Sequence, residues 1–389
     1  MDTFDALGVQ PSLTEKLKER YIIKPTVIQK IVIPGLLAGK SIIFRSATGT
    51  GKTLAYLLPL LQNVKTDSPG VAVLIIAPTL ELCSQIKNEI SLLSASPCAL
   101  LTGSVNPDKQ VNSLVKNKPR IAVGNPGRLL ALVKTGKLQF NNLSFLVLDE
   151  ANKLTASECI DETRQLLSLI EKGIHGQNLQ ISACSATVNA KTRDKLGSLF
   201  RTAEIIESDD HEILRGRIEH WAVYSEKRKN VDTLRSLLAT IKAKKKRFKA
   251  LVFTSRNDTA GLVLNKLQFH HIAASGLFSK AEGKPLSSGE RKAALDNFRS
   301  GKISVLVSTD LAACGLDIHG LSYIIALDVN EDSDVYIHRC GRTARAGKHG
   351  IMITIGDEHA LRRLASIEKK LKIVVHPKEL SYGQIKDIK

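Results

Sequence analysis

Short apolar runs rich in β-branched residues recur along this chain of 389 residues, and they alternate with stretches of helical periodicity. In the first half the runs lie near residues 41–45, 72–77, 98–102, 120–123, 145–149 and 180–184. Strand patterns that alternate with helix patterns are typical of crossover connections around a parallel sheet. The pattern therefore predicts an α/β fold.

The alternation is interrupted by a polar, acidic stretch from Glu204 to Gly216 and then starts again. The later apolar runs lie at residues 221–224, 250–253, 303–307, 323–327 and 350–354. A chain of this length has room for two domains of ordinary size. We therefore expect a first domain at 1–204, a linker at 205–217 and a second domain at 218–389, which ends in a short basic tail from Glu368.

Composition narrows the class of protein. No apolar run approaches the roughly 20 residues of a membrane span, and the first five residues are too acidic for a signal peptide. Six cysteines are scattered without a Cys-x-x-Cys pair, which argues against a zinc site or a disulfide framework. We expect an intracellular protein that resides in the cytoplasm, or in the nucleus or nucleolus if the cell is eukaryotic.

The charge is strongly basic and uneven. The formal net charge is +18, of which +5 falls in residues 1–210 and +13 in residues 211–389. Such a balance favours a polyanionic partner, although solubility alone is an alternative explanation. Aromatic residues make up only 4% of the chain, so contacts with phosphates are expected to outnumber contacts with bases. Residues 242–249 hold six basic side chains and are expected to form a solvated helix end, with nucleic-acid contact as the alternative.

A Gly-rich turn follows the apolar run at 42–44 and ends in Lys52-Thr53. Gly49 and Gly51 allow consecutive backbone N–H groups to point at phosphate oxygens, and a helix beginning near Lys52 adds its positive N-terminal dipole. Lys52 can bind the β- and γ-phosphates, and the Thr53 hydroxyl can bind Mg²⁺. The strict phosphate-loop pattern has Gly where this chain has Ser46, so an ordinary surface turn is the alternative.

Two acids, Asp149 and Glu150, follow the apolar run at 145–148. Mg²⁺ is usually held by only one or two carboxylates, so Asp149 suffices as its protein ligand. Glu150 is then free to orient or deprotonate the attacking water. Together with the Gly-rich turn, this pair predicts binding and hydrolysis of ATP.

Three arginines, Arg339, Arg342 and Arg345, lie within seven residues of the second half. Arginine binds phosphate in a bidentate manner and can act as an arginine finger, which accelerates phosphoryl transfer by roughly 10³–10⁵. The second half has no phosphate loop of its own, so these side chains can reach ATP only if the two domains close. The pattern predicts a motor, with an exposed basic helix start as the alternative.

These motifs, in this order and over essentially the whole length, resemble the DEAD-box family of ATP-dependent RNA helicases of superfamily 2. The resemblance implies two tandem RecA-like parallel-sheet domains of the P-loop NTPase type. It also implies that Phe4 stacks on the adenine base, that Gln29 bonds the base edge and that Asp317 contacts the ribose. The full set of nucleotide-binding residues implied is Phe4, Lys24, Gln29, Ala47, Thr48, Gly49, Thr50, Gly51, Lys52, Thr53, Gly315 and Asp317.

The same resemblance implies positions for RNA binding and for coupling. The RNA-binding residues implied are Pro78, Thr79, Gly103, Ser104, Gln110, Arg128, Thr254, Arg291 and Thr309. The residues implied to couple hydrolysis to strand separation are Asn152, Ser185 and Thr187, together with His338 and Arg339 as an interdomain pair. RNA is the expected partner, the chain is expected to act as a monomer, and a protein partner is expected to supply targeting.

Five residues depart from the family pattern: Leu80 and Cys314 replace arginines, Asn152 replaces Asp, Ser288 replaces Gln and Ala344 replaces Gly. The residues that touch ATP and metal are all retained. We therefore expect intact ATP binding with weakened RNA affinity or interdomain coupling. An ATP-gated RNA clamp with little unwinding is the alternative function, and a DNA-directed helicase is a third.

Overall fold

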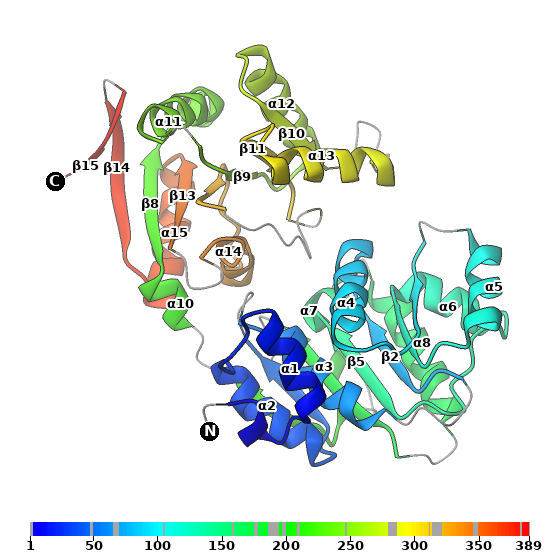
Figure 1. The fold of residues 1–389 in the computed structure, drawn as a ribbon. Helices are drawn as coiled ribbons and strands as arrows, with labels where there is room; N and C mark the ends of the chain where they lie inside the picture. Colours follow the sequence, from blue (N-terminus) through cyan, green and yellow to red (C-terminus); the bar gives the residue numbers. More distant parts are fainter. Residues whose placement is uncertain are drawn as a thin grey trace. The chain divides into compact units, whose positions relative to one another are not determined.

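The computed structural model describes residues 3–46, 50–64, 70–103, 106–157, 159–174, 178–185, 194–196, 200–207, 211–245, 247–278, 286–310, 312, 321–344, 349–381 and 383–388. The chain forms two compact units, residues 1–209 and 210–389. Each unit is an α/β layer structure built on its own sheet (Figure 1). The α/β class with parallel sheets that the sequence predicts is confirmed.

Unit 1 is a seven-stranded sheet in the order β3-β4-β2-β5-β6-β1-β7, and every pair of neighbours is parallel. Its strands are β1 (Ile42–Arg45), β2 (Val73–Ile76), β3 (Cys98–Leu101), β4 (Ile121–Gly124), β5 (Phe145–Asp149), β6 (Gln180–Ser185) and β7 (Glu204–Glu207). The first six lie within a residue or so of the predicted runs. Their carboxyl ends meet at one edge of the sheet, where open α/β folds bind ligands.

Helices cover both faces of this sheet. The segment η1 (Asp5–Leu7) and α1 (Pro11–Glu19) precede the first strand, and α5 (Pro107–Asn117) and α7 (Ala151–Leu154) follow β3 and β5. One face is covered by α2 (Val27–Leu37), α3 (Lys52–Asn63) and α4 (Leu80–Leu93), and the other by α6 (Pro126–Lys134) and α8 (Ile160–Gly173). Burial on both faces explains why the central strands are continuous apolar runs rather than alternating ones.

Unit 2 is an eight-stranded sheet in the order β10-β11-β9-β12-β13-β8-β14-β15, parallel except for the last pair. Its strands are β8 (Ile218–Tyr224), β9 (Ala250–Phe253), β10 (Ala274–Leu277), β11 (Val305–Ser308), β12 (Tyr323–Ala326), β13 (Gly350–Gly356), β14 (Val375–Ser381) and β15 (Gln384–Asp387). After the short turn η3 (Lys227–Lys229), α11 (Asn230–Lys244) and α12 (Asn257–Phe269) cover one face. The other face is covered by α13 (Ser288–Ser300), α14 (Ser333–Cys340) and α15 (Glu358–Leu371).

The predicted linker at 205–217 contains regular structure. Glu204–Glu207 forms β7, which pairs with β1 at the edge of the first sheet, and α10 (His211–Gly216) packs beside β8 in unit 2. The strand was missed because only two apolar residues stand between two glutamates. Those glutamates make ion pairs with Lys40 and Arg45, and charged residues are common on edge strands.

The basic tail is also structured. Figure 1 shows β14 beside β8, with β15 as the outer strand of a hairpin. Lys378 forms an ion pair with Asp387 and lies 5.1 Å from the ring centroid of Trp221. Pro377 within β14 weakens the strand pattern, because proline is confined to edge strands and bulges. The hairpin therefore depends on the edge that β8 offers, which the local sequence does not reveal.

The composition predicts neither a membrane-spanning helix nor a zinc site or disulfide framework. Within the described ranges, no helix is both long enough and apolar enough to cross a membrane. In the same ranges no three His, Cys, Asp or Glu side chains gather as metal ligands, and Cys83, Cys98, Cys159, Cys184 and Cys340 are free thiols.

His220, on β8, connects the sheet of unit 2 to α10, which lies in the predicted linker. Its Nε2 lies 2.8 Å from the Leu214 carbonyl of α10, and its Nδ1 lies 2.8 Å from the Tyr336 hydroxyl of α14. A carbonyl can only accept, so Nε2 carries the proton and Nδ1 accepts from Tyr336. Burial lowers the pKa of His220, His376 lowers it further, and the Leu214 bond and Glu368 oppose this.

This environment predicts a pH dependence of stability. As the pH falls below about 6.5, the unfolded chain takes up a proton at His220 before the folded chain does, so the free energy of unfolding decreases. His220→Gln should reduce that decrease between pH 7.5 and 5.5, as measured by urea unfolding of the full chain. His359→Gln, at an exposed position on α15, is the control and should retain the wild-type slope. An unchanged slope in His220→Gln would contradict the assignment.

Candidate functional site

The Gly-rich turn of unit 1 begins where β1 ends. The backbone N–H of Ser46 donates to the Ser185 carbonyl at 3.0 Å, which extends the pairing of β1 with β6. Lys52 is the first residue of α3, is buried, and donates through Nζ to the Ser46 carbonyl at 2.8 Å. The hydroxyls of Ser46 and Thr50 are hydrogen-bonded to each other. Lys52 thus reaches across the turn, as a phosphate-binding lysine must. Three other expected residues of the turn lie outside the described residues: Ala47, Thr48 and Gly49.

Gln29 connects the predicted adenine-binding segment to this turn. Its Oε1 accepts from the Thr26 N–H at 2.9 Å, which caps α2, and its Nε2 donates to the Gly51 carbonyl at 3.0 Å. Gly51 has φ of +90°, and a Cβ there would lie 2.3 Å from Gln29 Nε2, so only glycine fits. Gln29 is buried, and both the oxygen and the nitrogen of its side-chain amide are hydrogen-bonded within the unit.

The expectation for Phe4 is wrong. Its side chain is only 3% exposed and packs in an apolar cluster with Leu7, Leu13, Leu17 and Leu58. A ring buried in the core offers no face for a base to stack on. Lys24, in contrast, is exposed.

Sequence reasoning missed two exposed apolar side chains beside Lys24. They are Tyr21, which is exposed and has φ of +59°, and Ile23. A positive φ is uncommon for a bulky residue. The signal available in the sequence was their residue type, an aromatic and an aliphatic residue next to the segment expected to bind a base.

Asp149 lies at the end of β5 with only 2% of its surface exposed. Its Oδ2 accepts from the Tyr56 hydroxyl at 2.9 Å, and its Oδ1 accepts from the Glu150 N–H at 2.9 Å and from Cys184 Sγ at 3.1 Å. Burial raises the pKa of Asp149, the neighbouring Glu150 raises it further, and Cys184, Lys52 and Tyr56 oppose the rise. A buried carboxylate beside a second acid is an oxygen donor set suited to a hard cation such as Mg²⁺.

Glu150 has a strained backbone. Its φ and ψ are +54° and +50°, in the left-handed region, at the turn from β5 into α7. Such conformations of residues other than glycine cluster at active sites, where they aim a side chain. Glu150 is buried like Asp149, so the turn keeps both carboxylates at the same edge of the sheet.

Two of the expected coupling residues of unit 1 lie on elements next to this turn, one on α7 and one at the end of β6. Asn152 is in α7, and its Oδ1 accepts from the Lys153 N–H at 2.9 Å. Ser185 ends β6, the neighbour of β5, and is fully buried. Thr187 lies outside the described residues.

Three of the expected RNA-binding residues meet at the ends of β3 and β4. Arg128 donates to Gln110 Oε1 at 2.9 Å and to the Gly103 carbonyl at 3.4 Å, and Gln110 donates to the Thr102 carbonyl at 2.9 Å. The structure therefore brings Gly103, Gln110 and Arg128 into one hydrogen-bonded cluster. Ser104 lies outside the described residues.

The segment after β2 contributes to the same edge of the sheet. Thr79 caps α4 by accepting from the Leu82 N–H at 3.3 Å, and it follows Pro78. Leu80, where the family pattern has arginine, is the first residue of α4. This helix start therefore lacks a cationic side chain at the position where the resemblance expects one.

In unit 2 the central feature is Arg339, which is 2% exposed. Its Nε and Nη2 donate to the two oxygens of Asp310 at 2.7 and 2.8 Å. Its Nη1 donates to the Asp328 carbonyl at 2.9 Å, and Nη2 also donates to Asp328 Oδ1 at 2.8 Å. Burial lowers the pKa of Arg339, but Asp310 and Asp328 outweigh it and raise the pKa above its usual value.

This environment gives Arg339 a role inside unit 2. The guanidinium lies 5.3 Å from the ring centroid of Phe253, and Asp328 Oδ2 also accepts from the Ser255 N–H at 2.6 Å. Arg339 thus joins the ends of β9, β11 and β12 to α14. The sequence pointed to an interdomain pair, and Asp328 was missed because no motif contains it.

The other expected residues of unit 2 surround these strand ends. Thr254 is buried, donates to the Arg256 carbonyl at 3.1 Å and bonds through its N–H to Ser308. Arg291 donates to the Ala312 carbonyl at 2.6 Å, and Thr309 is buried. Arg342 is buried next to His338, whose carbonyl accepts from its Nε at 3.3 Å. Four further residues with expected roles or departures, Cys314, Gly315, Asp317 and Arg345, lie outside the described residues.

Ala344 shows a physical consequence of its departure from the family pattern. Its φ is +55°, in the region that glycine adopts without steric cost and other residues adopt at a cost of roughly 1–2 kcal/mol. The turn after α14 therefore keeps a glycine-like conformation although its residue carries a Cβ.

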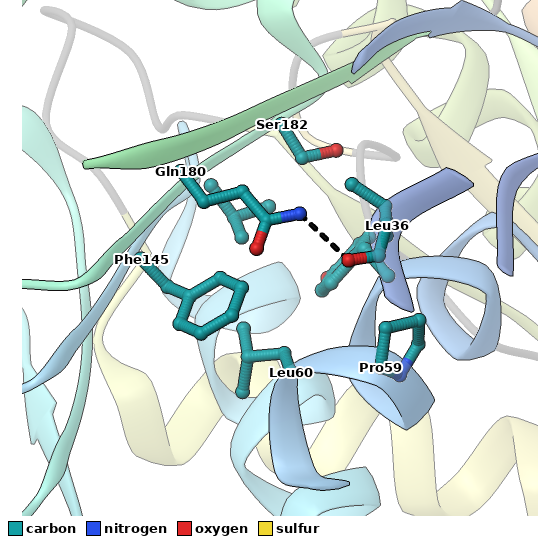
Figure 2. Close-up of a pocket in the computed structure, with 8 residues that line it drawn as sticks. Leu36, Pro59, Leu60, Phe145, Gln180 and Ser182 are labelled. Carbon is teal, nitrogen blue, oxygen red and sulfur yellow. Dashed lines mark hydrogen bonds between the residues drawn. The ribbon is translucent and has the colours of Figure 1, made fainter. Parts of the chain in front are cut away.

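A separate small pocket lies between α2, α3, β5 and β6. Figure 2 shows Gln180 bonded to the Leu36 carbonyl at its rim, with Phe145, Pro59 and Leu60 around it. No charged side chain lines it. The pocket is apolar and lacks the groups that phosphate chemistry needs, so we place the functional site at the strand ends instead.

The buried hydrogen bonds of Arg339 predict that even a conservative substitution of this residue lowers the free energy of unfolding substantially. Arg339→Lys keeps the charge but loses the planar fork, which leaves part of Asp310 or Asp328 unpaired, so the free energy of unfolding should fall by about 3 kcal/mol. Arg363→Lys is the control, because its ion pair with Glu331 is half exposed and should be worth less than about 1 kcal/mol. Urea unfolding of the full chain measures both. Equal effects of the two changes would contradict the buried network.

Comparisons with known proteins identify the relatives of this chain. The sequence profile of the DEAD/DEAH box helicase family matches residues 26–196, and that of the helicase conserved C-terminal domain matches residues 229–347. The DEAD-box ATP-dependent RNA helicase CshC of Bacillus cereus is 32% identical over 384 residues, covering 98% of this chain and 94% of CshC. The probable ATP-dependent RNA helicase YfmL of Bacillus subtilis is 32% identical over 366 residues, covering 93% of each.

Solved structures show the same fold. Dbp5 of S. cerevisiae, bound to RNA and ADP BeF3, matches with a TM-score of 0.84 at 24% identity, covering 98% of this chain and 96% of that one. A DEAD box protein from Methanococcus jannaschii matches with a TM-score of 0.55 at 26% identity, covering 98% and 99%. With two RecA-like units and relatives that match along nearly its whole length, this chain belongs to the DEAD-box helicase family.

Proposed function

We propose that this chain is an ATP-dependent RNA helicase that binds RNA without sequence specificity and locally unwinds short duplexes or remodels RNA–protein complexes. The observation that carries the proposal is the edge of the first sheet, where the phosphate turn with Lys52, the acids Asp149 and Glu150, and Ser185 follow three adjacent strands. CshC and YfmL are named as ATP-dependent RNA helicases. Their identity to this chain supports the same activity here.

The nucleotide would bind at this edge. Lys52 and the N-terminus of α3 supply positive charge for the phosphates, and Gln29 connects the base-binding segment to the turn at Gly51. Lys24 would flank the base. Gly315 and Asp317 of unit 2 would contact the nucleotide, with Asp317 at the ribose.

Mg²⁺ fits the oxygen donors of this site. Asp149 and the Thr53 hydroxyl would hold it, because hard cations take oxygen ligands and Mg²⁺ needs few from the protein. When bound, the ion neutralises negative charge on the transferring phosphoryl group. Glu150 orients the attacking water and accepts its proton, a task for which its strained backbone aims the carboxylate.

Hydrolysis would be coupled to closure of the two units. Arg342 and Arg345 would reach the γ-phosphate only in the closed form, so that the arginines complete the site in one state and leave it in the other. The change between the open and closed forms would be transmitted by Asn152, Ser185, Thr187 and His338. Arg339 would contribute by keeping the strand ends of unit 2 in place through Asp310 and Asp328.

RNA would be held mainly by its backbone. Thr79, the cluster of Gly103, Gln110 and Arg128, and the strand-end residues Thr254, Arg291 and Thr309 supply donors for phosphates and 2′-hydroxyls. Leu80 and Cys314 supply no charge where the family pattern has arginines. Each lost phosphate contact should reduce the slope of log binding constant against log salt concentration by about 0.7 on a single strand. Because RNA is then bound more weakly, we expect only modest stimulation of ATP hydrolysis by RNA.

Two other functions deserve a test. An ATP-gated RNA clamp with little unwinding is suggested by Leu80, Asn152 and Cys314, but the named activities of the relatives favour unwinding. A DNA-directed helicase would be stimulated by DNA rather than RNA. We expect a monomer that is directed to its RNA by a protein partner.

Strand displacement measured beside ATP hydrolysis tests the proposal. The full chain should release one strand of a short RNA duplex when ATP and Mg²⁺ are present, and RNA should stimulate hydrolysis more than DNA of the same sequence. Hydrolysis and ATP-dependent RNA binding without displacement would indicate the clamp. Preferential stimulation by DNA would indicate the third function.

The role of Glu150 can be tested separately. Glu150→Gln keeps the size of the side chain but removes the proton acceptor, so kcat for ATP hydrolysis should fall by about 10²–10⁴ while ATP-dependent RNA binding persists. Glu171→Gln, at an exposed position on α8, is the matched control and should keep the wild-type kcat. Full turnover in Glu150→Gln would show that another group activates the water.

A further inference from the structure

The carboxylate of Asp149 is held from the protein side by groups that belong to none of the motifs discussed above. Tyr56 donates to Oδ2 at 2.9 Å, and Cys184 lies 3.1 Å from Oδ1. Both side chains are fully or almost fully buried, with Tyr56 only 1% exposed. Water therefore cannot substitute for either donor without a rearrangement of the core.

The position of Tyr56 follows from the helix that carries the phosphate-binding residues. It lies four residues after Lys52 and three after Thr53 on α3, and residues at these spacings share a helix face. Burial and then Asp149 raise the pKa of Tyr56 well above its usual value, and a hydrogen bond with Thr53 opposes the rise. The phenol thus donates to Asp149 and is also hydrogen-bonded to Thr53, and these are the two residues expected to hold Mg²⁺.

Cys184 approaches from the neighbouring strand. In the parallel pairing of β5 with β6, Asp149 and Cys184 are register partners. Its buried Sγ lies 3.1 Å from Asp149 Oδ1, where the thiol acts as a weak donor. It supports Oδ1 together with the backbone N–H of Glu150.

The three donors leave Asp149 little freedom to rotate. They come from three different elements, α3, β6 and the turn after β5, and they engage both carboxylate oxygens. An ionised carboxylate has about four acceptor positions, so the three donors still leave a position for a cation. Partners behind a metal ligand fix its orientation, and their loss typically costs 10–100-fold in metal affinity.

We propose that Tyr56 is a positioning residue that orients the Asp149 carboxylate for Mg²⁺ and couples it to the phosphate-binding helix, with Cys184 as a second support. This rests on the proposed function, because it assumes that Asp149 holds the ion. Tyr56 has no part in the chemistry itself. Its contribution is to keep Oδ2 aligned while Lys52 and Thr53, on the same helix, engage the nucleotide.

The test measures Mg²⁺ dependence of nucleotide binding rather than turnover. A fluorescent ATP analogue is titrated onto the full chain in EDTA and then at increasing Mg²⁺. Tyr56→Phe removes only the hydroxyl, so it should keep the affinity in EDTA but raise the Mg²⁺ concentration at half-effect by about 10-fold. Tyr323→Phe, in β12 of unit 2, is the matched control and should keep the wild-type midpoint.

Cys184 offers a rescue comparison. Cys184→Ala removes the donor and should raise the Mg²⁺ midpoint, whereas Cys184→Ser restores a hydroxyl donor and should return it toward the wild-type value. This pair also carries the test if Tyr56→Phe fails to fold. A role in packing alone would weaken binding equally with and without Mg²⁺ and would overturn the proposal.

The outcomes separate this inference from the proposed function. If the wild-type chain binds nucleotide without any Mg²⁺ dependence, the function assigned to Asp149 is wrong. If the wild type depends on Mg²⁺ but Tyr56→Phe and Cys184→Ala keep its midpoint within twofold, only the positioning role is overturned.

Discussion

A carboxylate held almost entirely out of water at the end of a central strand is the constraint on which unit 1 depends. Asp149 is 2% exposed, and burial raises its pKa with Glu150 adding to the effect. Burying a charge is costly unless it is paired and hydrogen-bonded. The hydroxyl of Tyr56, the thiol of Cys184, the N–H of Glu150 and the charge of Lys52 all act to offset that cost, so the elements around the site are arranged about this one group.

Unit 2 also organises its strand ends around a buried charge, but of the opposite sign. Arg339 is matched inside the unit by Asp310 and Asp328 and packs against Phe253. Unit 2 therefore satisfies its own buried charge, whereas unit 1 offers a carboxylate pair that a cation can stabilise. Ligands that bind only the folded chain raise its stability, so nucleotide and Mg²⁺ are expected to act mainly on unit 1.

Backbone strain is found at two functional turns. Glu150 and Ala344 both have positive φ, one at the acidic motif and the other at the turn after the arginine-bearing helix α14. At Glu150 the left-handed backbone joins the end of β5 to α7 and sets the direction of the side chain. At Ala344 the turn requires a glycine-like conformation, and the alanine there is tolerated because the packing around α14, with Cys340 and Ala344 in the same apolar cluster, fixes the backbone.

The sequence by itself determined the α/β class, six of the seven strands of unit 1 and the residue types expected at the nucleotide site. These follow from local signals: buried parallel strands are continuous apolar runs, and a phosphate loop needs its residues at fixed spacing. Only the tertiary structure decided that 204–207, 375–381 and 384–387 are strands, since each depends on the open edge of a sheet formed by distant residues. It also buried Phe4, placed Tyr56 and Cys184 behind Asp149, and matched Arg339 with Asp328. Such contacts join segments that are far apart in the chain, and no local pattern encodes which side chains will meet when the layers pack.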